Sequence, residues 1–167
     1  MHADPDALAD DPATEAMRQR VAGSNISPVT LLATDYLNHF NEIAMLLELL
    51  PDMPDMLEEA KAWQPKSYVE HFQQSTIADR DLAVACWPVV PSRFKAPFEK
   101  TIETLNLLIP QIIDHAELLI ASGDQDRLQH RIRAGVQALH LYIESASGII
   151  HGSDRTLDQG EIDRLLR

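Results

Sequence analysis

Two histidines and a carboxylate recur along one helical face in the last third of the chain. His140, Glu144 and His151 are separated by four and then seven residues, with Ser147 between them. Residues at this spacing share one face of an α-helix. Imidazole and carboxylate groups both bind divalent metal ions. The pattern therefore indicates either a metal or small-ligand site, or a polar face that is solvated or pairs with another helix, and we favour the polar face.

A second polar face lies earlier in the chain, where Asp35, His39 and Glu42 recur at helical spacing. Helical bundles that hold two metal ions usually supply a glutamate from each of two helices and a Glu-x-x-His motif from each of two others. The sequence contains no Glu-x-x-His motif. We therefore expect no metal ion and no other bound cofactor.

The common catalytic motifs are missing from the sequence. It contains no glycine-rich phosphate-binding loop, no Gly-x-Ser-x-Gly motif and no Cys-x-x-Cys motif, so nucleotide, hydrolase and redox functions are not indicated. Cys86 lies in an apolar run, which is typical of a buried, inert thiol. A phosphotransfer histidine usually lies in a His-x-x-Lys-Gly motif, whereas His140 is followed by Leu-Tyr-Ile-Glu. Any catalytic residues therefore stay unassigned.

Two further groups of residues have both a structural and a functional interpretation. The first group is aromatic and either packs in the core or lines a small-molecule pocket: Trp63, Trp87, Phe94 and Phe98. The second group consists of small side chains along one flank of a helix: Ala134, Ala138, Ser145 and Gly148. Small side chains let a second helix approach closely, so this flank is a candidate surface for homodimerisation.

The apolar pattern places these side chains on helices. Ser27 and Pro28 form a helix-start signal, and apolar residues then recur every three or four positions until Pro51. The same spacing predicts long helices over residues 92–121 and 124–152. Three long helices with shorter helices between them indicate an all-α, up-and-down helical bundle.

Shorter elements complete the predicted organisation. A short helix is expected between Pro54 and Pro65, and Ser67 with Glu70 forms a capping box that opens another. Residues 77–91 are interpreted as a connector, in which ADRDLAVAC is helical by composition and the two prolines of WPVVPSRF favour an extended chain. The predicted domains are a disordered acidic N-terminus, a helical bundle and a C-terminal docking helix, over residues 1–13, 14–152 and 153–167.

The composition favours a single cytoplasmic domain. A chain of 167 residues is long enough to bury one core without disulfides or metal ions. Its single cysteine cannot form an internal disulfide, and no secretion signal opens the sequence. No stretch approaches the roughly 20 apolar residues of a membrane-spanning helix. We therefore expect the protein to act in the cytoplasm.

The charge of the chain is acidic and unevenly distributed. The net charge is −12, and residues 1–60 carry twelve acidic side chains but only two arginines. The whole chain contains four lysines. Nucleic acids and acidic membranes bind proteins through clustered basic side chains, so neither is expected as a partner.

The last twelve residues, TLDQGEIDRLLR, resume an amphipathic pattern after the third long helix. Asp158 and Glu161 form a capping-box pattern, and Ile162, Leu165 and Leu166 then fall on one face. A helix this short is not stable alone in water, because its nucleation is costly. It must therefore pack on its own bundle or in a groove on another protein.

The segment LDQGEIDRLL is similar to the docking peptide that opens flagellar motor switch proteins. The matching positions are Leu157, Gln159, Glu161, Ile162, Asp163, Leu165 and Leu166. The segment also resembles the C-terminal tail of the chemotaxis response-regulator phosphatase, with Ile162 in place of a valine. Both peptides bind a chemotaxis-type receiver domain. The resemblance implies a signalling or adaptor protein that binds the receiver domain of a response regulator through its C-terminal helix.

The resemblance does not extend to catalysis. The phosphatase uses an acidic residue and a glutamine four residues apart, and Glu15 with Gln19 and Glu70 with Gln74 have this spacing. The longer motif that surrounds the pair in that family is absent. The docking residues are therefore transferred from the family, and no catalytic residue is.

Overall fold

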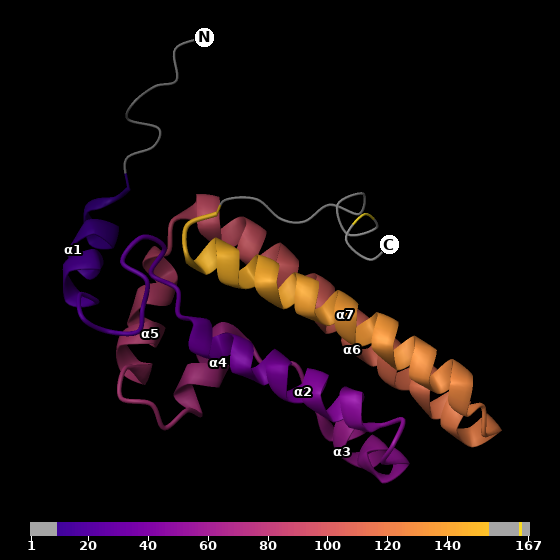
Figure 1. Cartoon of the computed structure of the whole chain (residues 1–167). Helices are drawn as coiled ribbons and strands as arrows, with labels where there is room; N and C mark the ends of the chain where they lie inside the picture. Colours follow the sequence, from indigo (N-terminus) through magenta and orange to yellow (C-terminus); the bar gives the residue numbers. More distant parts are fainter. Residues whose placement is uncertain (1–9, 154–163, 165–167) are drawn as a thin grey trace.

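The computed structural model describes residues 10–153 and Arg164 (Figure 1). Within these residues the chain is helical, and the only strand-like pairing is an isolated bridge between Ile26 and Ala33. The all-α class predicted from the spacing of apolar residues is therefore confirmed. None of the described helices combines the length and the apolar character that crossing a membrane requires.

Two long helices form a hairpin along one side of the molecule (Figure 1). α6 spans Ser92–Ser122 and α7 spans Gln125–Ile150, close to the ranges expected from the sequence. Gly123 ends α6 with a φ of 71°, a left-handed conformation that glycine adopts without strain. The Asp124 carboxylate then accepts a hydrogen bond from the N–H of Arg127 at 3.1 Å and starts α7.

The third long helix expected from the sequence is shorter than predicted. α2 spans Asn38–Leu49 and follows the 3₁₀ helix η2, Thr34–Leu37, so no helix begins at Pro28. α2 packs against α7, and its inner face meets the α6–α7 hairpin. The described chain therefore contains two long helices and one of 12 residues, where the sequence predicted three long helices.

A closed turn before η2 explains the late start of this helix. The Ser27 hydroxyl accepts hydrogen bonds from the N–H groups of Val29 and Thr30, as a helix cap does. Leu31 then adopts a φ of 64°, a left-handed conformation that an α-helix cannot include. The Ser27 N–H donates to the Leu32 carbonyl at 2.9 Å and closes the turn. The serine-proline signal therefore starts a turn and not a helix.

Short helices follow α2 as the sequence predicted. The 3₁₀ helix η3, Pro54–Met56, leads into α3, Leu57–Ala62. α4, Tyr68–Gln73, begins with the expected capping box: the Ser67 hydroxyl accepts from the Glu70 N–H, and the Glu70 carboxylate accepts from the Ser67 N–H. These caps form locally, because all their partners lie within one turn.

Helices also occupy two segments that the sequence predicted to be helical only in part. The expected connector contains α5, Arg80–Cys86, and the 3₁₀ helix η4, Trp87–Val89. α1, Pro12–Arg20, begins inside the segment whose composition predicts disorder, residues 1–13. The Asp11 carboxylate caps α1 by accepting from the N–H of Ala13 at 2.7 Å, and residues 1–9 lie outside the described part of the chain.

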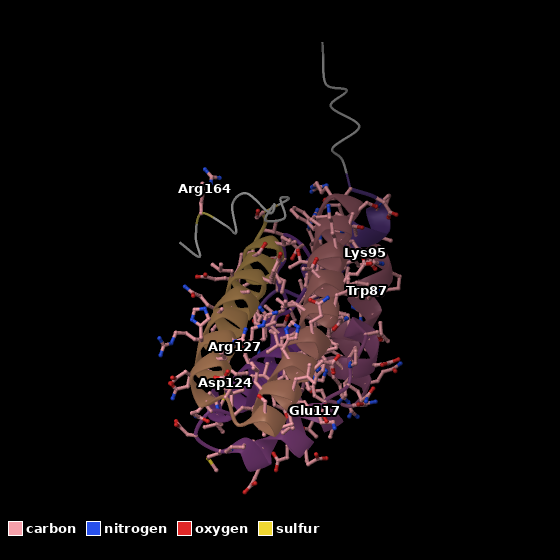
Figure 2. All side chains as sticks on the ribbon, turned by 90° about the vertical axis from the view of Figure 1, so that its right-hand side faces the viewer. Trp87, Lys95, Glu117, Asp124, Arg127 and Arg164 are labelled. Carbon is pink, nitrogen blue, oxygen red and sulfur yellow. The ribbon has the colours of Figure 1, made fainter. Side chains whose placement is uncertain are left out.

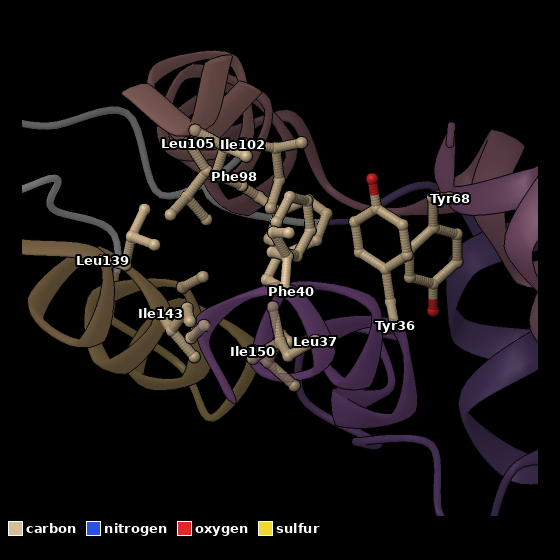
Figure 3. Close-up of a cluster of buried hydrophobic side chains, with 14 of the residues drawn as sticks. Tyr36, Leu37, Phe40, Tyr68, Phe98, Ile102, Leu105, Leu139, Ile143 and Ile150 are labelled. Carbon is tan, nitrogen blue, oxygen red and sulfur yellow. The ribbon is translucent and has the colours of Figure 1, made fainter. Parts of the chain in front are cut away.

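The core lies between α2, α6 and α7 (Figure 3). Phe40, Leu105 and Leu139, one from each of these helices, are completely buried. Tyr36 and Tyr68 extend this core toward α4, and the centroids of their rings lie 5.4 Å apart. Burial of these side chains supplies most of the driving force that holds the short helices on the hairpin.

Candidate functional site

The residues predicted to bind a partner lie outside the described part of the chain. They are the seven positions that match the receiver-docking peptides: Leu157, Gln159, Glu161, Ile162, Asp163, Leu165 and Leu166. Arg164 has helical backbone conformation and an exposed side chain. What the structure describes in detail is the end of α7, from which the C-terminal segment leaves.

The end of α7 is fixed by a residue from the turn before η2. The Thr30 hydroxyl is buried and donates a hydrogen bond to the Ile150 carbonyl at 2.6 Å. Gly152 follows with a φ of 120°, and a side chain at that position would contact Val29. A helix end has carbonyl groups without partners inside the helix, so this hydrogen bond both satisfies the carbonyl and sets where α7 ends.

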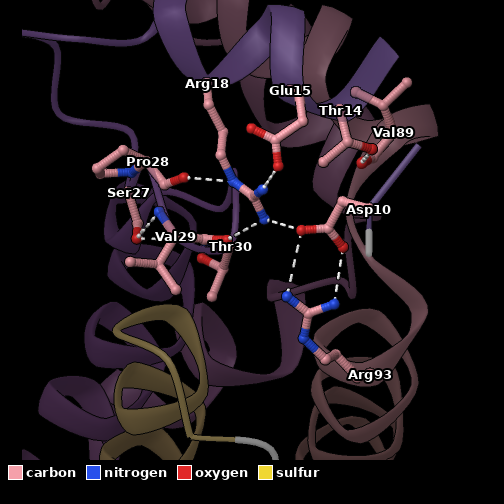
Figure 4. A network of polar contacts seen from close by, with 10 residues as sticks. All are labelled: Asp10, Thr14, Glu15, Arg18, Ser27, Pro28, Val29, Thr30, Val89 and Arg93. Atoms are coloured by element: carbon pink, nitrogen blue, oxygen red, sulfur yellow. Dashed lines mark hydrogen bonds and ion pairs between the residues drawn. The ribbon is translucent and has the colours of Figure 1, made fainter. Parts of the chain in front are cut away.

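Arg18 connects the same turn to α1 and α6 (Figure 4). Its guanidinium donates to the carbonyl groups of Pro28 and Val29 at 2.9 and 3.1 Å. It also forms ion pairs with Glu15 and Asp10. Because the two carbonyl groups belong to the turn that holds Ile150, α1 and the end of α7 are linked through one side chain.

Asp10 extends this network to the first turn of α6. Its carboxylate accepts two hydrogen bonds from the Arg93 guanidinium, at 2.7 and 3.2 Å, in addition to its pair with Arg18. The hydrogen bond from Arg93, followed by that from Arg18, holds the pKa of Asp10 below its ordinary value. The network, defined here as Asp10, Arg18 and Arg93, is therefore charge-paired at neutral pH.

His140 and Glu144 line a groove between the C-terminal half of α2 and α7, here named the α2–α7 groove. Its volume is about 650 Å³, and Glu48, Asp52 and Arg133 also line it. The His140 Nε2 atom lies 3.5 Å from the Glu48 Oε1 atom. The predicted polar face thus forms one wall of a groove and pairs with α2 across it.

His151 does not belong to this groove. It lies eleven residues after His140, which corresponds to about 16 Å along a helix. His140, Glu144 and His151 therefore share a face but cannot bind one metal ion together. Within residues 10–153 and at Arg164, no three histidine, cysteine, aspartate or glutamate side chains come together as a metal site.

The second predicted polar face is divided between the interior and the surface. His39 is buried and its Nε2 atom donates to the Gln64 carbonyl at 2.6 Å, while Glu42 is exposed. The His39 ring stacks on Trp63 with 4.7 Å between centroids. Burial is the main cause that lowers the pKa of His39. This histidine therefore holds the segment after α3 through the Gln64 carbonyl. The helical spacing placed His39 on a polar face and did not predict its burial.

The four aromatic residues for which the sequence left both a core and a pocket role open fall into two pairs with different surroundings. Trp87 and Phe98 line a cleft beside α4, as the pocket interpretation predicted. Trp63 stacks on His39, and Phe94 is buried with the Arg93 guanidinium 4.8 Å from its ring centroid. Trp63 and Phe94 are therefore structural.

Cys86 is buried as expected. It has no disulfide partner, and burial raises the pKa of its thiol to about 11. A thiol with this pKa is almost entirely protonated at neutral pH, so it is a poor nucleophile. Cys86 therefore contributes to packing at the end of α5.

Both acid–glutamine pairs have their acidic residue engaged in the fold. Glu70 forms the capping box of α4 through Ser67, and Glu15 pairs with Arg18. Neither carboxylate is held in a cleft with its glutamine. The structure therefore offers no reason to assign a catalytic role to either pair.

The close approach of α6 and α7 involves a glycine that the sequence analysis did not single out. A Cβ atom at Gly135 would lie 2.9 Å from Cδ1 and 3.0 Å from Cγ1 of Ile112. By contrast, Gly148, in the predicted stripe of small residues, has no atom within 4 Å of such a Cβ. Gly148 therefore does not mediate the contact within the hairpin, and the use of the stripe in a homodimer stays a prediction.

Comparisons with protein families, with curated proteins and with solved structures find no match to this chain. Its function is therefore inferred from the chemistry of the residues themselves. Two features are relevant: the sequence pattern after α7 that resembles receiver-docking peptides, and the clefts between the folded helices.

Proposed function

We propose that the protein is a signalling adaptor that captures the receiver domain of a chemotaxis-type response regulator with residues 157–166. The observation that carries the proposal is the match at seven positions to peptides that bind such domains. The match combines three aliphatic residues on one helical face with acidic residues beside them.

The expected contact follows from the types of these side chains. Ile162, Leu165 and Leu166 would fill an apolar groove on the receiver domain, in the way that amphipathic helices bind to grooves. Glu161 and Asp163 would meet basic residues at its rim. Ordering so short a helix costs conformational entropy, so we expect a modest affinity and fast exchange between bound and free receiver.

The fixed end of α7 supports an adaptor arrangement. Thr30 and Arg18 hold the turn that closes α7, so the docking segment starts from a defined point on the bundle. A captured receiver would therefore be kept near the helices. We place this complex in the cytoplasm, where receiver domains act.

Catalysis is not part of the proposal. A receiver phosphatase needs a carboxylate and an amide that meet the phosphoaspartate together. Glu15 and Glu70 are engaged by Arg18 and Ser67, so the residues that have the right spacing serve the fold. The adaptor would hold the receiver without changing its phosphorylation.

Deletion of residues 156–167 tests the proposal. We expect the truncated protein to bind phosphorylated receiver domains of its host at least tenfold more weakly than the full chain, as measured by isothermal titration calorimetry. Its melting temperature should change by less than about 2 °C, because the network at Arg18 and Thr30 is retained. Equal affinity of the two proteins, or no affinity in either, would contradict the proposal.

Small-ligand binding in the α2–α7 groove is the second candidate function. The groove volume of about 650 Å³ lies within the roughly 300–1,000 Å³ typical of ligand sites. His140, Glu48 and Glu144 supply polar groups within it. Elemental analysis for metal ions and mass spectrometry for released organic ligands, on the purified protein and on His140→Ala, separate the two functions: a stoichiometric metal ion or organic ligand that is lost in the variant would favour the groove.

A further inference from the structure

A cleft of about 570 Å³ opens between the start of α4 and the middle of α6. Its inner wall is formed by four aromatic side chains from four different elements: Tyr36, Tyr68, Trp87 and Phe98. Figure 3 shows Tyr36, Tyr68 and Phe98 packed together at the side of the core. The cleft, here named the aromatic cleft, shares no lining residue with the α2–α7 groove.

The aromatic wall is held in place before any ligand binds. The Tyr36 hydroxyl donates to the Lys66 carbonyl at 2.5 Å, and the Tyr68 hydroxyl accepts from the Ala33 N–H at 2.9 Å. The Trp87 ring stacks on Tyr68 with 4.9 Å between centroids. The Lys95 Nζ atom lies 4.2 Å from the Trp87 centroid (Figure 2). A preformed apolar wall of this kind is a common feature of ligand sites.

The rim of the aromatic cleft is acidic. Glu70 of α4 and Glu99 and Glu103 of α6 line it, and Lys66 is the one base among the lining residues that the structure describes. Glu99 and Glu103 are one helical turn apart, so their charges repel each other. A cation bound between them would relieve this repulsion. Charge complementarity therefore favours a cationic ligand over a neutral or anionic one.

Asn106 adds an unused hydrogen-bond acceptor to the same cleft. It follows Glu103 by three residues, so it lies on the same side of α6. Its Oδ1 atom is buried and accepts no hydrogen bond from any described residue. A buried acceptor without a partner costs free energy. Rotation of the Asn106 amide about χ2 would bring this oxygen to an N–H group of a ligand.

We propose that the aromatic cleft binds a small organic cation. The apolar body of the ligand packs against Trp87 and Leu107, which line the cleft and are partly exposed or exposed, over the buried Tyr36 and Phe98. Its ammonium or amidinium group lies among the three carboxylates and donates one hydrogen bond to Asn106. This proposal is independent of receiver binding, because the aromatic cleft is lined by residues between Tyr36 and Leu107, whereas the docking segment is residues 157–166.

Titration of the full-length protein with three probes of similar size tests this proposal. The probes are benzamidinium, benzyl alcohol and benzoate, and binding is followed by calorimetry and by the fluorescence of a Trp63→Phe variant, in which Trp87 is the one tryptophan left. We expect benzamidinium to bind at least tenfold more tightly than either of the others. Its affinity should fall as the salt concentration rises, since exposed charges are screened. Equal binding of the three probes, or no binding of benzamidinium, would overturn the proposal.

Two variants separate a ligand site from a structural cluster. The double variant Glu99→Gln/Glu103→Gln should weaken benzamidinium binding about tenfold, whereas Glu58→Gln/Glu59→Gln removes equal charge from α3 and should leave it unchanged. Asn106→Leu should also weaken binding while keeping or raising the melting temperature, because it removes an unpaired polar atom. Unchanged affinity in Glu99→Gln/Glu103→Gln and in Asn106→Leu would refute the site.

Discussion

The two ends of the α6–α7 hairpin are held in different ways. At the Gly123 end, the hydrogen bond from the Gln125 side chain to the Pro51 carbonyl, 2.6 Å long, lies at the surface. At the other end, the buried Thr30 hydroxyl and the Arg18 network connect α1, the turn before η2 and both long helices. The end with the buried long-range hydrogen bond is the one from which the proposed docking segment leaves.

The difference between the two ends bears on how the hairpin opens locally and on how the proposed docking segment is held. Regions with few buried contacts open at low free-energy cost, whereas buried networks open only with the whole fold. At the Gly123 end the long-range hydrogen bond lies at the surface, and the helices are held there by apolar side chains that include the buried Leu50 and Leu128. At the end of α7 the buried hydrogen bond from Thr30 adds a polar contact to the apolar packing, and this contact would keep a captured receiver beside the bundle.

The largest expected effect is that of Arg18→Ala. This change removes the donors to Pro28 and Val29 and leaves Asp10 with one arginine partner. We expect the free energy of unfolding to fall by about 2 kcal/mol, because hydrogen bonds to charged groups are lost. Gln125→Ala, at the other end, should change it by less than about 0.5 kcal/mol. Urea denaturation measures both changes, and equal losses of unfolding free energy in the two variants would show that the polar contacts at the two ends contribute equally.

Thr30→Val tests the contact with Ile150 without changing the shape of the side chain. The buried Ile150 carbonyl would lose its partner, and we expect a loss of about 1–2 kcal/mol in the free energy of unfolding. Thr104→Val is the matched control, because the Thr104 hydroxyl donates to the Lys100 carbonyl in an exposed helical turn. A larger loss in the control would show that Thr30 does not hold the end of α7.

Gly135→Ala tests the middle of the hairpin. Its methyl group would collide with Ile112, so we expect a loss of about 1 kcal/mol from overpacking, even though alanine favours helix formation. Gly148→Ala meets no neighbour and should stabilise the protein by up to about 1 kcal/mol. Thermal unfolding of both variants checks the opposite signs, and stabilisation by Gly135→Ala would show that the Ile112 side chain moves aside without cost.

The smallest expected effect is that of pH on the segment between α2 and α4. Burial is the main cause that lowers the pKa of His39 and His71 below their ordinary value of 6.5. The unfolded chain therefore takes up protons below about pH 6.5 that the native state does not, so stability is complete above this pH and falls as the pH decreases. Denaturation at pH 7.5 and 5.5 measures the difference.

His39→Gln keeps a donor for the Gln64 carbonyl and removes one of the two titrating groups. The loss of stability between pH 7.5 and 5.5 should therefore become smaller in this variant. His130→Gln, at an exposed position on α7, is the control and should leave the loss unchanged. A native state that gains stability at pH 5.5 would contradict the assignment of His39 and His71 as buried neutral groups.

Local signals in the sequence predicted the parts of the fold that depend on neighbouring residues. The capping box of Ser67 and Glu70 and the cap at Asp124 form as expected. The limits of α6 and α7 follow from the spacing of apolar residues within a continuous helix. In these cases the hydrogen-bond partners are at most four residues apart, so the sequence contains them together.

Contacts between distant residues explain where the predictions failed. Ser27 and Pro28 look like a helix start, but Thr30 hydrogen-bonds to Ile150, a residue 120 positions away. The spacing placed His140 and Glu144 correctly on one face, yet it could not show that Glu48 lies opposite. The unpaired Asn106 oxygen could not be predicted from the sequence, because a missing hydrogen-bond partner is recognised only when the surrounding residues are known.

Receiver binding by the full-length protein with and without Leu165→Glu tests the central claim most directly. A charge in place of this leucine should weaken binding of a phosphorylated receiver at least tenfold in calorimetry, because a carboxylate is costly to bury in an apolar groove. Leu118→Glu changes an exposed leucine on α6 and should have no effect. Equal affinities of the Leu165→Glu variant and the unchanged protein would contradict the account.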